Sequence, residues 1–350
     1  MCFEKDKLLS GNSKFASGQT PFDNSDADKK LLPRVSVIIP LHVVNQRFKQ
    51  DLQHYLSIDY PDYEIIAVAD RTVDVGSSRI RIIYTGKENT GPAEKRDIAI
   101  KECSGAICAF IDDDAFPTKD WLKNATRHFK NPDIAAVGGP GLTPPTDGLM
   151  ERAGGAVYSS ILGSGKVSYR YISGTLREVD DYPAYNLLIR KSVLQDVGGF
   201  SSTFYGGEDT KVCLSIVNLG KKIIYDPTVV VYHHRRPLFV GHLKQVVNVG
   251  IHRGYFTKAY PRTSRRLFYL LPPLVTIAFV VTIVLSFFFA PARLILLAMV
   301  AAWLVVGFIS VLLVEKDLRV AFLAAFGIMA THLAYGVAFL RGLTTRRLER

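Results

Sequence analysis

Three consecutive carboxylates, Asp112, Asp113 and Asp114, are the residues whose type and spacing could most directly do chemistry. They end the apolar run 106–111, and a short apolar run of this kind predicts a buried strand. Side chains of an extended segment alternate between its faces, so Asp112 and Asp114 should point one way and Asp113 the other. Like charges this close favour a cation between them, and Mg²⁺ or Mn²⁺ prefers such oxygen ligands. We therefore expect a divalent-metal site at Asp112 and Asp114, with a solvated acidic turn as the alternative and a structural role for Asp113.

A second acidic pair, Glu208 and Asp209, precedes an apolar helical pattern that ends at Gly220. The dipole at the N-terminus of a helix stabilises negative charge and would keep this pair ionised. Helix capping is a common role for such residues and is the leading interpretation for Glu208. For Asp209, capping competes with a role in catalysis.

The acidic residues need a scaffold, and residues 33–236 predict one in which strands alternate with helices. This order indicates an α/β fold with a mostly parallel central sheet. Ligands of such sheets bind at the carboxyl ends of the strands, where both Asp70 and the triplet 112–114 fall. Asp70 taken alone could be an ordinary turn residue. The expected strands are 35–40, 63–70, 80–84, 106–111, 135–139, 185–190, 223–227 and 229–234.

Two segments of this half have no clear periodicity. Residues 1–32 are polar and predict a flexible tail. Residues 140–180 are rich in Gly, Ser and Tyr, and we expect them to form a mobile loop over the substrate. The four cysteines show no metal-binding spacing. No signal peptide is visible, so residues 33–236, called the catalytic unit below, should stay on the cytoplasmic side.

The basic charge of the chain is concentrated at its apolar end. Residues 237–350 hold 13 Lys/Arg against 3 Asp/Glu, a net charge of +10 out of +11 for the whole chain. The near-neutral remainder excludes nucleic acid as the expected partner, because its recognition needs basic residues around the folded unit. The pattern fits a surface of anionic membrane lipids better.

This C-terminal end predicts a membrane anchor. Residues 237–267 form a basic amphipathic segment typical of the membrane interface, or else a basic helix packed on the catalytic unit. Within 268–341, three apolar stretches follow, each long enough to cross a bilayer, and a basic tail, 342–350, ends the chain. Three crossings put that tail opposite the catalytic unit, against the positive-inside rule, unless one segment is re-entrant. The stretches are 268–289, 294–314 and 320–340, the last with His332, which should face other helices.

The ordered set of motifs resembles the family 2 inverting glycosyltransferases of GT-A fold, over about residues 33–236. The resemblance implies a nucleotide-diphospho-sugar transferase domain and a divalent metal cofactor, Mg²⁺ or Mn²⁺. The motifs that carry it are Val-Ile-Ile-Pro at 37–40, Asp70, Ile-Asp-Asp-Asp at 111–114, Gly-Gly-Phe at 198–200, Glu208-Asp209 and Tyr232-His233.

The resemblance also implies roles for the residues that match the donor site. Asp114 would hold the metal, and Asp112 would contact the nucleotide and the metal. Pro40 and Asp70 match positions near the nucleoside, although only one acid stands where the family usually has two. Arg96 falls where the family often has Ala-Arg-Asn, and we expect it to contact the donor nucleotide.

Further matches concern catalysis. Asp209, with Glu208 before it, matches the second acid of the family's Glu-Asp pair, the general base. A histidine after the last strand is a metal ligand in some relatives, so His233 or His234 could be one, the alternative being a structural histidine. The Gln-x-x-Arg-Trp motif of processive synthases is missing, because Gln245 is followed by Val246, Val247 and Asn248. Transfer should therefore be non-processive.

These features lead us to expect a multi-pass enzyme of the cell membrane. It would move a sugar from a nucleotide-sugar donor to a hydroxyl of a lipid-linked or polysaccharide acceptor. The alternatives are a polyprenyl-phosphate glycosyl synthase and a non-enzymatic membrane scaffold. A nucleotidyltransferase is disfavoured because residues 40–48 lack the glycines of a triphosphate-binding loop.

Overall fold

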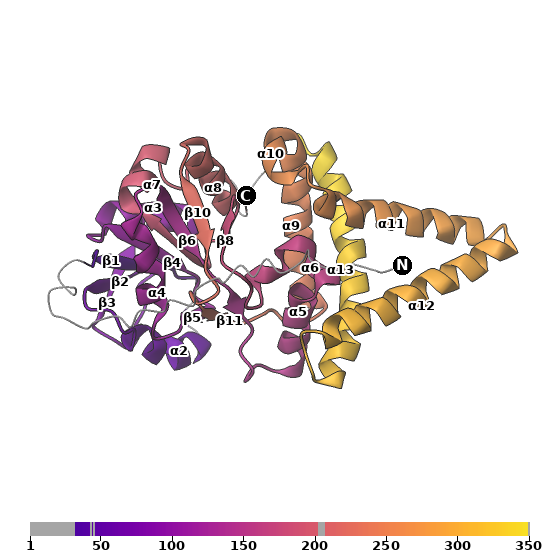
Figure 1. Ribbon diagram of the computed structural model, residues 1–350, viewed down its shortest axis with the longest axis horizontal. Coiled ribbons are helices and arrows are strands. Elements are labelled where there is room, and N and C mark those ends of the chain that lie inside the picture. The colour runs from indigo at the N-terminus through magenta and orange to yellow at the C-terminus, as the bar shows by residue number, and fades with distance from the viewer. Residues whose placement is uncertain (1–31, 43, 45, 202–206, 349–350) are drawn as a thin grey trace, which may run out of the picture. The chain divides into compact units, whose positions relative to one another are not determined.

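The computed structural model describes residues 32–348 except for 43, 45 and 202–206 (Figure 1). The predicted flexible tail, residues 1–32, and the last two residues of the basic tail therefore lie outside the described residues, apart from Leu32. The chain from Pro33 onward forms one compact unit.

The centre of the catalytic unit is an eight-stranded sheet in the order β3-β2-β1-β4-β9-β6-β10-β8. Neighbouring strands from β3 to β4 are parallel, as are β6 and β10, whereas β9 runs antiparallel to both β4 and β6. The predicted α/β fold with a mostly parallel sheet is thus confirmed. The strands are β1 (Val35–Pro40), β2 (Tyr63–Ala69), β3 (Ile80–Tyr84), β4 (Ile107–Ile111), β6 (Ile134–Gly138), β8 (Arg177–Val179), β9 (Asn186–Arg190) and β10 (Lys222–Tyr225).

Apolar side chains on both faces explain why these strands lie inside. Every residue of β1 and β4 is buried, which is typical of strands that helices cover on both sides. The covering helices include α3, which begins at Pro92, where proline is well suited to a first helical position. The helices of this unit are α2 (Gln46–Leu56), α3 (Pro92–Glu102), α4 (Trp121–Thr126), α7 (Lys191–Val197) and α8 (Glu208–Asn218), with the 3₁₀ turn η1 (Arg127–Lys130).

A second, three-stranded sheet lies at the end of β4. It consists of β5 (Ala115–Pro117), β11 (Val231–His233) and β7 (Gly141–Leu142), with β11 in the middle. β11 is antiparallel to β5, and its register pairs His233 with Ala115. This register brings the end of β11 beside the acidic triplet, 119 residues earlier in the chain at Asp114.

The segment 140–180 is not the loop that the sequence indicated. It contains α5 (Leu149–Ser159), α6 (Ile161–Ser164) and the 3₁₀ turn η2 (Gly165–Arg170), followed by β8. Ala153 and Val157 of α5 belong to an apolar cluster with Val311 and Ile328 of the C-terminal helices. Its helical pattern was hidden because small residues, such as Gly154 and Gly155, form the packed face.

Five helices complete the chain: α9 (Val240–Ala259), α10 (Pro261–Ser264), α11 (Leu267–Ser286), α12 (Ala290–Leu312) and α13 (Leu318–Thr344). The last three are long and apolar enough to cross a membrane, near the predicted bounds. His332 faces other helices as expected, because Trp303 of α12 donates to its Nδ1 at 3.2 Å. The basic helix α9 packs on the catalytic unit, the alternative that the sequence left open, since its Arg253 pairs with the buried Asp181 at 2.8 Å.

Candidate active site

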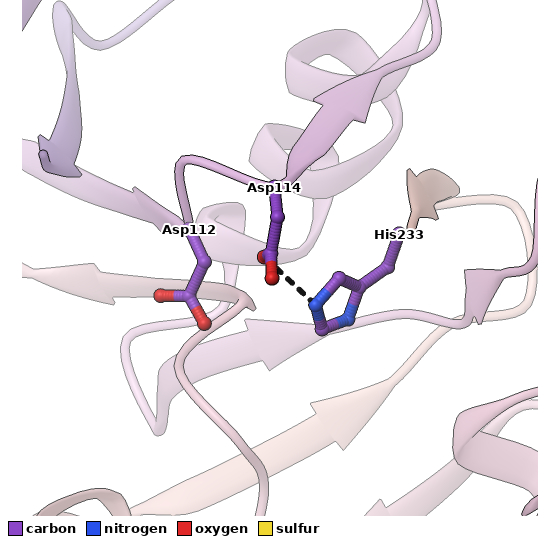
Figure 2. Close-up of side chains that lie close together, drawn as sticks. All are labelled: Asp112, Asp114 and His233. Carbon is purple, nitrogen blue, oxygen red and sulfur yellow. Dashed lines mark ion pairs between the residues drawn. The ribbon is translucent and has the colours of Figure 1, made fainter. Parts of the chain in front are cut away.

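The predicted metal ligands converge at the carboxyl end of β4. Ligand atoms of Asp112, Asp114 and His233 all lie within 4.8 Å of one another (Figure 2). Nε2 of His233 is 2.9 Å from Oδ1 of Asp114. Two carboxylates and one imidazole in this arrangement are a donor set that suits a divalent cation such as Mn²⁺.

The electrostatics of the two carboxylates differ. Burial raises the pKa of Asp112 and outweighs the nearby guanidinium of Arg96. Burial would also raise the pKa of Asp114, but His233 together with Arg236 and Arg235 outweighs burial and lowers it. Two half-buried carboxylates with a histidine at the same point fit a bound cation, which would offset the repulsion between them.

Asp113 lies outside this cluster, as expected, although β4 ends at Ile111 and residues 113 and 114 form a turn and not the continued strand that the expectation assumed. Its Oδ2 accepts a hydrogen bond from the backbone N–H of His42 at 2.7 Å. Because His42 follows the end of β1, this bond ties the triplet to the neighbouring strand. The contact supports a structural role for Asp113.

Arg96 connects the two acidic motifs. One amino nitrogen lies 2.7 Å from Oδ1 of Asp112 and the other 3.0 Å from Oε1 of Glu208. Its guanidinium also lies over the ring of Phe200, 5.2 Å from the ring centroid. The sequence indicated that Arg96 contacts the donor nucleotide, but it did not indicate this bridge. The bridge gives Glu208 an ion-pair partner on α3, which a role in helix capping does not explain.

Asp209 lies at the start of α8, after Gly207, whose φ of +80° suits glycine. Its Oδ1 accepts the backbone N–H of Thr210 at 2.8 Å. Burial, together with the charges of Glu208 and Asp181, raises the pKa of Asp209 to about 7. A carboxylate with a pKa near neutrality is suited to act as a general base.

The predicted nucleoside region borders a hollow of about 550 Å³ beside the ends of β1 and β2. Asp70 lines it and accepts from the Thr90 backbone at 3.2 Å and from Thr85 Oγ1 at 3.1 Å. The buried Lys95 lies 3.1 Å from Asp70 and donates to the carbonyl of Leu41, directly after Pro40. Sequence reasoning missed Lys95 as a positioning residue, and its place beside Arg96 was the only signal for it.

His234 is not brought to the metal-ligand cluster. Its Nδ1 lies 2.6 Å from Asp147 and its Nε2 2.9 Å from Asp51. Burial lowers the pKa of His234, but the two carboxylates outweigh burial and raise it to about 9. His234 therefore links α2 to the turn before α5, and of the two histidines only His233 faces Asp114.

Comparison with known proteins concerns the fold and part of the site. Residues 36–198, somewhat less than half of the chain, match Glycosyl transferase family 2. The matched range includes the acidic triplet, Asp70 and Arg96, and it ends before Glu208, Asp209 and His233. The fold around it is the GT-A-like α/β arrangement.

Two curated relatives and one solved structure are similar to the chain. A pre-mycofactocin glycosyltransferase of Mycobacterium tuberculosis is 30% identical over 146 residues, which cover 42% of this chain and 30% of that protein. Glycosyltransferase AglE of Haloferax volcanii is 27% identical over 237 residues, which cover 63% of this chain and 72% of that protein. The chain thus spans less than a third of the mycobacterial relative's length.

The solved structure is the mannosyltransferase PcManGT from Pyrobaculum calidifontis in complex with GDP-Man and Mn²⁺. The likeness has a TM-score of 0.60 at 19% sequence identity and covers 91% of this chain and 89% of that chain. At this identity it concerns the fold alone.

Proposed function

We propose that the protein is a membrane-anchored, metal-dependent, inverting glycosyltransferase that uses a nucleotide-sugar donor. The observation that carries the proposal is the convergence of Asp112, Asp114 and His233 within 4.8 Å at the carboxyl end of β4. This edge of an α/β sheet is where such folds bind ligands. The catalytic unit would lie on the cytoplasmic side of the cell membrane.

Asp112, Asp114 and His233 would hold the cation, Mg²⁺ or Mn²⁺. When bound, a divalent cation neutralises charge that develops on the leaving diphosphate. Arg96 keeps the carboxylate of Asp112 in place through its 2.7 Å contact. The complex of PcManGT with GDP-Man and Mn²⁺ supports this cofactor class.

The donor nucleoside would occupy the hollow beside Asp70 and the end of β1 at Pro40. Asp70 presents carboxylate oxygens that accept hydrogen bonds, and ribose hydroxyls and base N–H groups are donors of the matching kind. Lys95, Thr85 and Thr90 hold that carboxylate in one position. A preoriented acceptor costs less entropy when the ligand binds.

Asp209 would remove the proton from the acceptor hydroxyl as that oxygen attacks the anomeric carbon. Because the attack comes from the face opposite the leaving diphosphate, the product is inverted and no covalent enzyme intermediate forms. Glu208 is held by Arg96 and contributes negative charge beside the base. A hydroxyl acceptor needs such a base, whereas a phosphate acceptor is already a nucleophile and would depend on Asp209 less.

The acceptor would be a lipid-linked or polysaccharide substrate at the membrane. The long apolar helices support this, since a site held at the bilayer raises the effective concentration of a membrane-bound acceptor. A polyprenyl-phosphate glycosyl synthase is the second candidate. Replacing Asp209 with Asn separates the two, because only the hydroxyl acceptor depends strongly on the base.

The direct test is a donor screen on the full chain purified in detergent. Hydrolysis of UDP-, GDP- and dTDP-sugars would be measured with Mn²⁺, with Mg²⁺ and with a chelator. We expect one donor to be hydrolysed only with metal, and the Asp114→Ala variant to be inactive. If no donor is hydrolysed and calorimetry with Mn²⁺ and UDP or GDP detects no binding, the protein is a non-enzymatic scaffold.

A further inference from the structure

The three long apolar helices differ in what covers them. In its most apolar stretch, α13 is 56% buried within the protein, against 17% for α11 and 22% for α12. The buried residues of α13 extend along the helix from Val320 to Gly342. Other parts of the protein therefore cover more than half of this stretch. The main partner of α13 is therefore the protein itself.

Both ends of α13 are attached to helices that pack on the catalytic unit. At the N-terminal end, Arg152 of α5 pairs with the capping residue Asp317 at 3.3 Å. At the C-terminal end, Nζ of Lys258 on α9 donates to the carbonyl of Thr345 at 2.8 Å. The full length of α13, about 40 Å for its 27 residues, thus lies between its contact with α5 and its contact with α9.

The middle of α13 is in equally close contact with α9. His242 on α9 lies 2.8 Å from the hydroxyl of Thr331. Gly254 on α9 approaches the backbone of Phe339 so closely that a Cβ there would lie 2.1 Å from its carbonyl oxygen. Such an approach requires glycine, and it leaves no room for lipid between the helices.

The two helices that contact α13 along its length, α5 and α9, are joined to the catalytic unit. α5 lies within the residues that match the glycosyltransferase family, and α9 is attached to that unit by the buried pair of Arg253 with Asp181. If α13 crossed the hydrocarbon layer, Lys244 and Arg253 of α9 would lie within it, because α9 runs beside α13 from His242, opposite Thr331, to Lys258, opposite Thr345. Charges in the hydrocarbon layer are costly, which argues against this placement.

The α11–α12 hairpin has the opposite character. α11 contains no charged residue and α12 contains only Arg293. Their 20 and 23 residues give lengths of about 30 and 35 Å, close to the thickness of a bilayer core. Beyond their contacts with His332 of α13, made by Thr276 and Trp303, both helices extend to an apolar turn (Figure 1), where Phe288 is 74% exposed. Lipid hydrocarbon is the partner that such a surface fits.

Charged residues mark the base of this hairpin on both sides. Arg265 and Arg266 precede α11, and Glu315, Lys316 and Asp317 follow α12. Arg266 pairs with Asp180 of the catalytic unit at 2.5 Å, which places the base beside that unit. The polar boundary therefore lies at the hairpin's base, on the catalytic side.

We propose that the α11–α12 hairpin alone enters the bilayer, that α13 lies along the catalytic side of the membrane, and that the C-terminal residues share that side with the catalytic unit. This arrangement replaces the three crossings expected from the sequence. It also removes the conflict with the positive-inside rule, because Arg341, Arg346 and Arg347 then lie on the same side as Arg265 and Arg266. The inference does not depend on the sugar or the acceptor.

The test is labelling with a membrane-impermeant maleimide on the full chain in sealed vesicles of both orientations. Cys103, Cys108 and Cys213 are buried, and Cys2 is replaced by Ser. Single reporters are then placed at three exposed positions: Lys123→Cys on the catalytic unit, Arg319→Cys at the start of α13 and Arg347→Cys in the C-terminal residues. The Arg319→Cys reporter is the matched control, because it lies on the catalytic side with either two crossings or three.

We expect all three reporters to be labelled from the same face of the membrane. Labelling of the Arg347→Cys variant from the face opposite to the other two would show three crossings and overturn the proposal. Insertion of the hairpin is tested separately by washing the membranes with alkaline carbonate. The chain should stay with the membrane, and its release into the wash would show that the hairpin is not inserted and would equally overturn the proposal.

Discussion

Arg253 of α9 donates a hydrogen bond to Oδ2 of Asp181 at 2.8 Å, in an ion pair that joins the C-terminal helices to the catalytic unit. Burial raises the pKa of Asp181, but Arg253 and Arg170 outweigh burial and hold it well below its usual range. Thr210 donates to the other carboxylate oxygen at 3.0 Å. Because Thr210 follows Asp209 in α8, the pair lies next to the candidate base.

Replacing Arg253 with Gln should destabilise the protein. The variant removes the closest cationic partner of a buried carboxylate, and breaking such a pair typically costs about 3–5 kcal/mol. Thermal unfolding of the detergent-solubilised chain measures the loss. The control is Lys244→Gln, at an exposed position of the same helix, which should change the melting temperature little. An equal loss in the two variants would contradict this account.

Asp114→Ala should abolish metal-dependent turnover, whereas Asp113→Ala should cost much less. Asp114 lies in the cluster with His233, and Asp113 points away to the backbone of His42. We expect a loss of at least about 100-fold for the Asp114 variant, since metal polarisation contributes several kcal/mol. Titration of Mn²⁺ against donor hydrolysis provides the measurement. Equal losses in the two variants would show that the triplet acts as an undivided acidic patch.

The adjacent histidines should respond differently to the same substitution. His233→Asn should weaken Mn²⁺ binding by about 10- to 100-fold, the effect usual for groups that hold or orient a metal. His234→Asn should leave Mn²⁺ binding intact and lower the melting temperature, because it removes contacts with Asp51 and Asp147. Calorimetry measures the Mn²⁺ affinity of each variant, and thermal unfolding measures its melting temperature. Weakened Mn²⁺ binding in the His234 variant would contradict the assignment.

The stability that His234 provides should also depend on pH. Its pKa is raised to about 9 in the folded protein, so the charged form is stabilised by folding. The contribution is therefore complete below the unfolded pKa of about 6.5 and is lost as the pH rises through about 9. The difference in melting temperature between wild type and His234→Asn should thus be larger at pH 6 than at pH 10. A difference that grows with pH has the wrong sign.

Turnover should rise with pH as Asp209 loses its proton. With a pKa of about 7, only about a tenth of the carboxyl groups are ionised at pH 6, so the rate there should be about a tenth of its plateau. Asp209→Asn should lower the rate by about 10²- to 10⁴-fold and remove this step from the pH profile. An acceptor that is already ionised, such as a polyprenyl phosphate, predicts a small effect of the same substitution. The two profiles therefore separate the candidate functions.

Local patterns were sufficient for most of the scaffold. The apolar runs of β1 and β4 and the proline that begins α3 are short-range signals, and the elements formed where they indicated. The prediction of a loop at 140–180 was wrong because the helices there pack against α13 through small residues. Small residues leave no apolar periodicity to detect in the sequence. The direction of β9 could not be derived either, because strand pairing depends on how distant segments meet.

The sequence by itself determined that carboxylates follow β4, at the edge of the sheet where ligands bind, whereas the turn after β4 sets how Asp112 and Asp114 face each other. It also determined that the last third of the chain is apolar and basic. Only the tertiary structure decided that His233 and not His234 joins the carboxylates, because the register of β11 with β5 sets which ring faces them. The bridge of Arg96 between Asp112 and Glu208, and the contacts that bind α13 to α9, likewise join segments far apart in the chain. Hydropathy measures the composition of a helix but not its neighbours, and the tertiary structure is what distinguishes the well-covered α13 from the largely exposed α11 and α12.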